Sequence, residues 1–82
     1  MARYFFHLRD GSDVLLDPDG VEFGTLDLMR AAVLHNARSV MAEDVGHGVL
    51  DLRFHIEVED ESGSIVYRLP FKHAVSIIPE AQ

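Results

Sequence analysis

The five histidines have the widest chemical range in this 82-residue chain, and two of them are predicted to share a surface. His7 and His55 lie in segments whose side chains alternate between two faces, and both fall on the face opposite the main apolar series. Two neighbouring imidazoles can bind a metal ion or act as a pH switch, and Glu57 would then have to complete the metal site. The alternative is that both are polar side chains on a solvated sheet face. We favour this alternative, because the spacing fixes no third ligand.

Other patterns that carry chemistry find little support. The chain has no cysteine, which removes disulfides and thiolate ligands. No serine lies in a Gly-x-Ser-x-Gly motif, and Gly46 and Gly48 follow the predicted helix, whereas a phosphate-binding loop precedes one. The acidic run from Glu57 to Glu61 lacks the ligand spacing of an EF-hand. We therefore expect no enzyme activity, no catalytic residues and no cofactor.

The composition describes a small acidic protein. Asp and Glu number 14 against 7 Lys and Arg, and the net charge of −7 opposes nucleic-acid binding, which depends on neutralising phosphates. A chain this short obtains only about 3–5 kcal/mol from its core, so oligomerisation would be a natural supplement. Nothing resembles a signal peptide, and no apolar run approaches the roughly 18 residues of a membrane span. We expect one domain over residues 1–82, located in the cytoplasm and without membrane contact.

The stretch over residues 26–45 predicts the one helix of the chain. Its apolar residues recur at steps of three and four, which places them on one stripe: Leu26, Met29, Val33, Ala37, Val40 and Met41. Thr25 is the expected N-cap, and Gly46 is the expected stop because glycine adopts the left-handed cap at low cost. The stripe must cover another element, and the flanking segments have the alternation of strands.

Strands are predicted over residues 3–9, 14–17, 50–59 and 64–69. We expect an α+β fold of order ββαββ, with the helix packed on one face of a four-stranded, mainly antiparallel sheet. The strand over residues 3–9 is apolar on both faces and is predicted to be central. Two orders remain open, the antiparallel order 2-1-3-4, towards which we lean, and 2-1-4-3, in which the two central strands are parallel. Residues 71–82 are unassigned, and within them a fifth strand, a helical turn or an arm onto a neighbouring molecule are all compatible with residues 74–78.

Three apolar residues are left over by this arrangement. Phe5 and Val66 are predicted on the open face of the sheet, and Leu34 lies beside Arg30 and Arg38 towards the edge of the helix stripe. An apolar cluster on an open face would indicate a surface for self-association. We therefore take Phe5, Val66 and Leu34 as interface candidates.

The opening Arg3-Tyr4-Phe5-Phe6-His7 and the later Glu57-x-Glu59-Asp60-x-x-Gly63 resemble the hallmarks of a small family of uncharacterised short proteins from alphaproteobacteria. The resemblance covers nearly the whole chain, including the Asp17-Pro18-Asp19-Gly20 turn. It implies a self-contained domain of unknown function. It supplies no catalytic or binding residue, although it draws attention to His7.

The first functional hypothesis is a non-enzymatic interaction or regulatory module that forms a homodimer. A second is an antitoxin-like or accessory partner of a larger basic protein, which an acidic domain would bind electrostatically. A third is a metal or small-ligand binder that uses His7 and His55. Direct binding to nucleic acid ranks last because of the charge.

Overall fold

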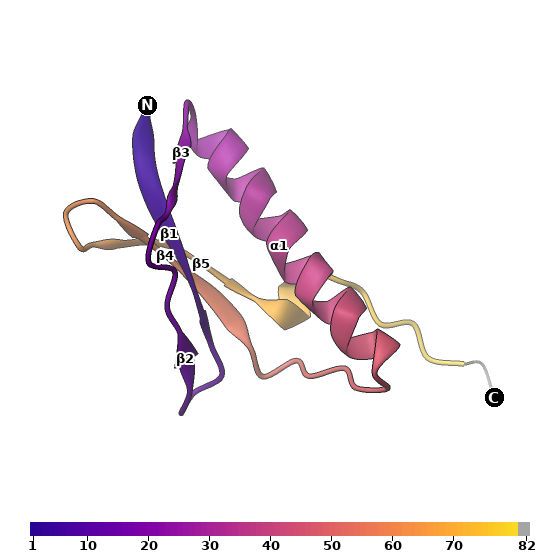
Figure 1. Ribbon diagram of the computed structural model, residues 1–82. Helices are drawn as coiled ribbons and strands as arrows, with labels where there is room; N and C mark the ends of the chain where they lie inside the picture. Colours follow the sequence, from indigo (N-terminus) through magenta and orange to yellow (C-terminus); the bar gives the residue numbers. More distant parts are fainter. Residues whose placement is uncertain (81–82) are drawn as a thin grey trace.

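The computed structural model, which describes residues 1–80, shows one helix packed across one face of an antiparallel sheet (Figure 1). The sheet has five strands, one more than predicted. The elements in chain order are β1 (Ala2–Arg9), β2 (Val14–Leu15), β3 (Val21–Phe23), α1 (Leu26–Gly46), β4 (His55–Asp60), β5 (Ile65–Pro70) and a 3-10 turn, η1 (Phe71–His73).

The strand order confirms the antiparallel alternative. β1 is central, β4 pairs with it on one side, and β5 pairs with the other side of β4. Both β2 and β3 pair with the remaining side of β1. The predicted strand over residues 14–17 is therefore only two residues long, and the extra strand β3 continues the same edge further along β1. Together β2 and β3 form one edge strand with an interruption.

The helix follows the prediction closely. Thr25 caps its first turn by accepting a hydrogen bond from the Leu28 amide at 3.1 Å. The helix continues one residue beyond the prediction, and the residue with the left-handed backbone is Gly48, at φ 86°, instead of Gly46. Four residues of the predicted stripe are fully buried: Met29, Val33, Ala37 and Met41. They pack on the sheet through Ile56, Val58 and Leu69.

Two details of β4 and β5 differ from the prediction. The strand predicted over residues 50–59 begins only at His55, because Asp51 closes a local turn. Its carboxylate accepts hydrogen bonds from the backbone amide and the guanidinium of Arg53 at 2.8–3.0 Å, and such side-chain bonds compete with a strand ladder. In β5 the register shifts beside Glu59, whose partner is Ile65. The resulting bulge takes Ile65 off the face of Leu69, and Ile65 is half exposed.

The segment after β5 completes the core. Phe71 and Ala74 are fully buried, and the Phe71 ring lies 5.8 Å from that of Phe54. The Phe71 amide donates to the Phe54 carbonyl, and the Arg38 guanidinium donates to the Ala74 carbonyl. Beyond this point residues 75–80, here called the arm, run past the C-terminal end of α1 and away from the sheet (Figure 1). The alternative of a fifth strand over residues 74–78 is therefore wrong, and residues 81–82 of the unassigned segment lie outside the described residues.

Within residues 1–80, α1 is too polar to cross a lipid bilayer.

Candidate functional site

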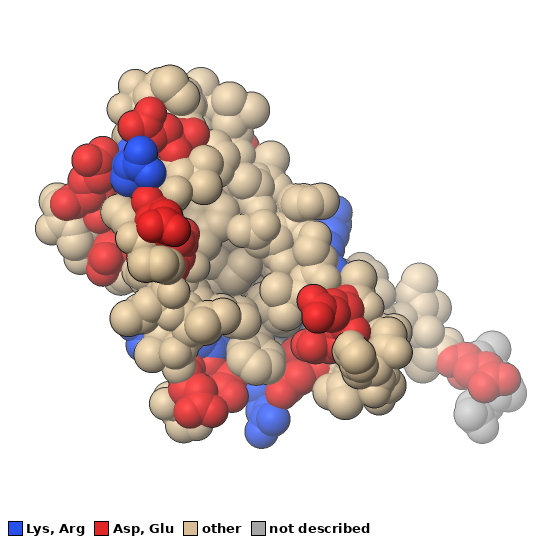
Figure 2. All heavy atoms as spheres, viewed as in Figure 1, with Lys and Arg blue, Asp and Glu red and all other residues tan. Residues whose placement is uncertain are grey.

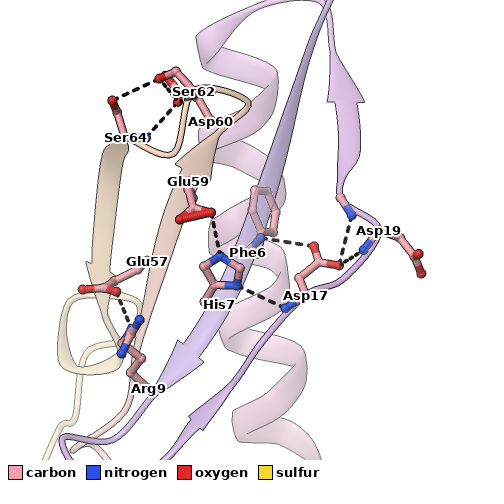
Figure 3. A network of polar contacts seen from close by, with 11 residues as sticks. Phe6, His7, Arg9, Asp17, Asp19, Glu57, Glu59, Asp60, Ser62 and Ser64 are labelled. Atoms are coloured by element: carbon pink, nitrogen blue, oxygen red, sulfur yellow. Dashed lines mark hydrogen bonds and ion pairs between the residues drawn. The ribbon is translucent and has the colours of Figure 1, made fainter.

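The interruption between β2 and β3 leaves the middle of β1 without a backbone partner on that side. β2 pairs with Leu8 and Arg9, and β3 pairs with residues 2–4, so residues 5–7 face a loop. A backbone amide in such a place needs another acceptor. Asp17 supplies it, because its Oδ2 accepts a hydrogen bond from the Phe6 amide at 3.2 Å (Figure 3). The carboxylate thus replaces the missing strand carbonyl.

The second oxygen of the same carboxylate shapes the loop itself. Oδ1 of Asp17 accepts hydrogen bonds from the amides of Asp19 and Gly20 at 3.2 and 3.1 Å. Partial burial acts to raise the pKa of Asp17, but the hydrogen bonds from the Gly20, Phe6 and Asp19 amides outweigh it and hold this pKa below its usual value. Asp17 therefore acts as an ionised structural acceptor.

Gly20 brings the loop back onto β1. Its φ of +70° lies in the left-handed region. A Cβ atom at this position would meet the Tyr4 carbonyl oxygen at 2.8 Å and the Phe5 ring at 2.9 Å. The position therefore requires glycine for two independent reasons, its backbone conformation and the lack of space.

His7 holds the other end of the loop. It is the one buried polar residue in the described part of the chain, with 6% of its surface exposed. Its Nδ1 accepts a hydrogen bond from the Asp17 amide at 3.1 Å, which assigns the proton of the neutral ring to Nε2. Nε2 lies 3.6 Å from Oε2 of Glu59 (Figure 3). His7 therefore links the loop to β4 across β1.

A second group of charges surrounds Glu57 on the open face. Its carboxylate contacts the Arg9 guanidinium and lies 3.6 Å from Nε2 of His55. In the sheet register His7 and Arg68 stand opposite Glu57 on the two neighbouring strands. The Glu57 carboxylate thus lies among several basic groups, and its ion pairs are with Arg9 and His55.

The structure brings the metal candidates onto one face but does not assemble a metal site. His7 pairs in register with Glu57, whereas His55 pairs with Arg9, so the two histidines stand diagonally with Arg9 and Glu57 between them. No group of three or more His, Asp or Glu side chains in residues 1–80 is arranged to hold a metal ion. Since Nδ1 of His7 already accepts a backbone bond, this ring is engaged in the fold.

The three interface candidates differ in how far their side chains are exposed. Phe5 is half-buried beside the Gly20 turn, and Leu34 is half-buried against the core. Only Val66, in the β5 bulge, is exposed, at 44%. Two hollows beside the helix are bordered by exposed apolar residues. One, of about 420 Å³, is bordered by Leu15 and Leu16, and the other, of about 460 Å³, by Val45 and other residues at the end of α1.

The sequence reasoning missed the roles of Asp17 and Glu59. Asp17 was assigned only to a turn, although an Asp-Pro-Asp-Gly motif offers a carboxylate to the amides that follow it. The sequence does contain a signal for the role of Asp17, since the family resemblance includes both the opening segment with His7 and this turn. The structure shows that the two motifs contact each other.

The comparisons with known proteins agree with this picture of a fold without an assigned activity. Neither the curated proteins nor the solved structures give a significant match to the chain. The model of one family, a domain of unknown function (DUF6894), matches residues 3–72, which includes β1, the Asp17 loop, the helix and both later strands. The chain therefore belongs to the DUF6894 family of domains of unknown function.

Proposed function

We propose that this protein is a non-enzymatic interaction module that forms homodimers, and that it acts in the cytoplasm. The observation that carries the proposal is the amount of surface that one copy leaves exposed. A monomeric protein of 9.2 kDa is expected to expose about 4,900 Å². The chain exposes 5779 Å², which is roughly 900 Å² more and close to the area of about 800 Å² that each partner buries in a standard interface.

The shape of the chain supports the same proposal. Its radius of gyration is 13.8 Å, whereas a compact domain of this length has about 12 Å. The arm contributes to the difference, and its residues Ile77 and Ile78 are 58% and 88% exposed. Large apolar side chains held in water in this way are stabilised when a partner covers them.

The contacts of the polar groups around β1 support the non-enzymatic part of the proposal. Asp17 uses its carboxylate for three backbone amides, and His7 uses Nδ1 for a fourth. Glu57 is shared between Arg9 and His55. Asp17 and His7 thus serve to hold the backbone of the loop, and the charge of Glu57 is balanced by its basic neighbours.

A titration of self-association tests the proposal. A trace of the chain labelled at its N-terminus is mixed with increasing unlabelled chain, and fluorescence anisotropy follows the association. We expect a saturable rise in anisotropy with a dissociation constant in the micromolar range. Added salt should lower this dissociation constant, because salt screens the repulsion between two copies of charge −7. A flat anisotropy up to about 1 mM, where even weak interfaces of this size associate, would contradict the proposal.

The acidic surface favours a second candidate, an accessory partner of a basic protein. Figure 2 shows acidic side chains gathered over the end of the sheet that holds β3 and the β4–β5 turn. There Arg3 is surrounded by Glu22 and Glu61, which accept hydrogen bonds from its guanidinium and its amide. Purification of the tagged chain from its own cells distinguishes the two proposals. A stoichiometric basic chain would support the second, and two copies of this chain alone would support the first.

A further inference from the structure

An apolar surface at the C-terminal end of α1 is not used by the fold. Its hollow is bordered by Arg38, Ala42, Val45, Leu50 and Ile77, which come from the helix, the segment after it and the arm. Val45, Leu50 and Ile77 are 55%, 45% and 58% exposed. We call these residues the helix-end surface.

The side chains that border this surface carry no negative charge. No Asp or Glu borders the hollow, although the chain contains 14 such residues. Two copies of charge −7 repel each other least where their carboxylates are absent. The helix-end surface is therefore a place where two copies can approach closely.

We propose that the helix-end surface joins two copies of the chain by antiparallel packing of their α1 helices around Ala42. The inference rests on the proposed self-association and adds its location. Arg38, Ala42 and Val45 follow one another at steps of four and three, so they form one ridge along the helix. The small Ala42 side chain at the middle of this ridge allows two helix axes to approach to about 8 Å.

The charges at the end of the helix fit this arrangement. The last turn of α1 contains no basic residue, and Glu43 and Asp44 lie near its carboxyl end, where a helix dipole favours cations. In an antiparallel pair centred on Ala42, position 38 of one copy faces position 46 of the other. Arg38 of each copy would then supply the missing cation to the partner helix. Arg38 makes no ion pair with any carboxylate in residues 1–80, since it donates to the Ala74 carbonyl.

The sheet edges are poorer sites for a second copy. At β5, Pro70 has no amide to donate, and the bulge beside Glu59 interrupts the ladder. On the other side, the Asp17 loop separates β2 from β3. The proline and bulge at one edge and the interruption at the other make both edges poor templates for strand addition, which favours the helix-end surface.

Charge substitutions test the location. We expect Val45→Asp and Ile77→Asp each to weaken dimerisation by at least about 30-fold, the effect of one central interface residue. The matched control is Leu15→Asp, at the other hollow, where Leu15 is 69% exposed. Circular dichroism confirms that each variant is folded. If wild type is monomeric throughout, the proposed function itself fails. If wild type is dimeric and Val45→Asp dimerises as well as Leu15→Asp, only the location is refuted.

A crosslink tests the orientation. The chain has no cysteine, so Ala42→Cys introduces a single thiol. If the two-fold axis passes beside Ala42, the two Cβ atoms come within the roughly 4 Å that a disulfide requires, and mild oxidation links the dimer. Ala31→Cys is the control, because position 31 is also exposed on α1 but lies three turns away. Crosslinking of Ala42→Cys that is no faster than that of Ala31→Cys would overturn the arrangement.

Discussion

Asp17 is predicted to be the most important single side chain for the edge of the sheet, and its replacement by alanine tests this role. The carboxylate accepts hydrogen bonds from the amides of Phe6, Asp19 and Gly20. Leaving a part-buried amide such as that of Phe6 unpaired costs about 1–3 kcal/mol, and the two turn bonds to the Asp19 and Gly20 amides contribute about 0.5–1 kcal/mol each. We therefore expect Asp17→Ala to lower the free energy of unfolding by about 2–5 kcal/mol, within the range of large single-site effects.

The control for this measurement is Asp19→Ala, in the same loop. It removes the same charge, but the Asp19 side chain is exposed and makes no hydrogen bond within residues 1–80. Urea unfolding followed by circular dichroism, at one fixed protein concentration because a dimer is stabilised by mass action, gives the free energy of each variant. Asp19→Ala should remain within about 0.5 kcal/mol of wild type. Equal midpoints for the two variants would refute the claim that the Asp17 carboxylate completes the edge strand.

Three further predictions concern the same loop. Gly20→Ala should lower the free energy of unfolding by about 2–4 kcal/mol, because it adds a steric clash to an unfavourable φ. The control is Gly11→Ala, at φ 98° but with open space around it, which should lose only the conformational part, about 1–2 kcal/mol. Equal losses of free energy in urea unfolding would argue against the close approach of the Gly20 turn to β1. The His7→Asn variant should be more stable than the similarly sized His7→Leu variant by about 1 kcal/mol, because the Asn Oδ1 can accept the hydrogen bond from the Asp17 amide in place of Nδ1. The reverse order in thermal unfolding would contradict the assigned tautomer. Folding lowers the pKa of Asp17, so its ionised form contributes stability above the unfolded pKa of about 3.9, and this stability is lost as the pH falls through the lower folded value. The difference in unfolding free energy between wild type and Asp17→Asn should therefore shrink below about pH 4. A difference that stays constant from about pH 7 to about pH 2 would count against this role of Asp17.

The regular parts of the fold were predictable because their signals are local. The 3-4 spacing of the stripe from Met29 to Met41, with Thr25 before it, identified the helix almost to the residue. Alternation identified β1, β4 and β5, and the apolar character of both faces of β1 identified the central strand. Each of these signals depends on residues within a few positions of one another.

The interrupted edge was not predictable from such signals. A strand of two or three residues, such as β2 or β3, contains no alternation long enough to detect. The bond between the Phe6 amide and Asp17 joins residues 11 positions apart, and it exists only because the edge strand breaks opposite Phe6. The start of β4 was misplaced for a similar reason, since the alternation from Leu50 continues through a turn that Asp51 closes with its side chain.

The candidate site was predicted in part. The placement of His7 and Glu57 on one face of the sheet followed from the period of two, and the structure confirms that their strands are neighbours. Phe5 lies on that face as the period of two predicts, since it pairs in register with Glu59, but the Gly20 turn packs beside its ring and leaves it half-buried. A period of two assigns a side chain to a face, but it gives no information about a loop that returns to cover that face.

The most direct test of self-association is the mass of the unmodified chain in solution. Sedimentation equilibrium at physiological salt, over concentrations from about 1 µM to about 1 mM, covers the range in which interfaces of ordinary size dissociate. We predict a concentration-dependent shift from the 9.2 kDa of one chain to twice that mass, with no larger species, because a two-fold contact closes on itself. A constant 9.2 kDa across the whole range would contradict the proposed homodimer, and a mass that keeps growing with concentration would contradict the closed pair of helices.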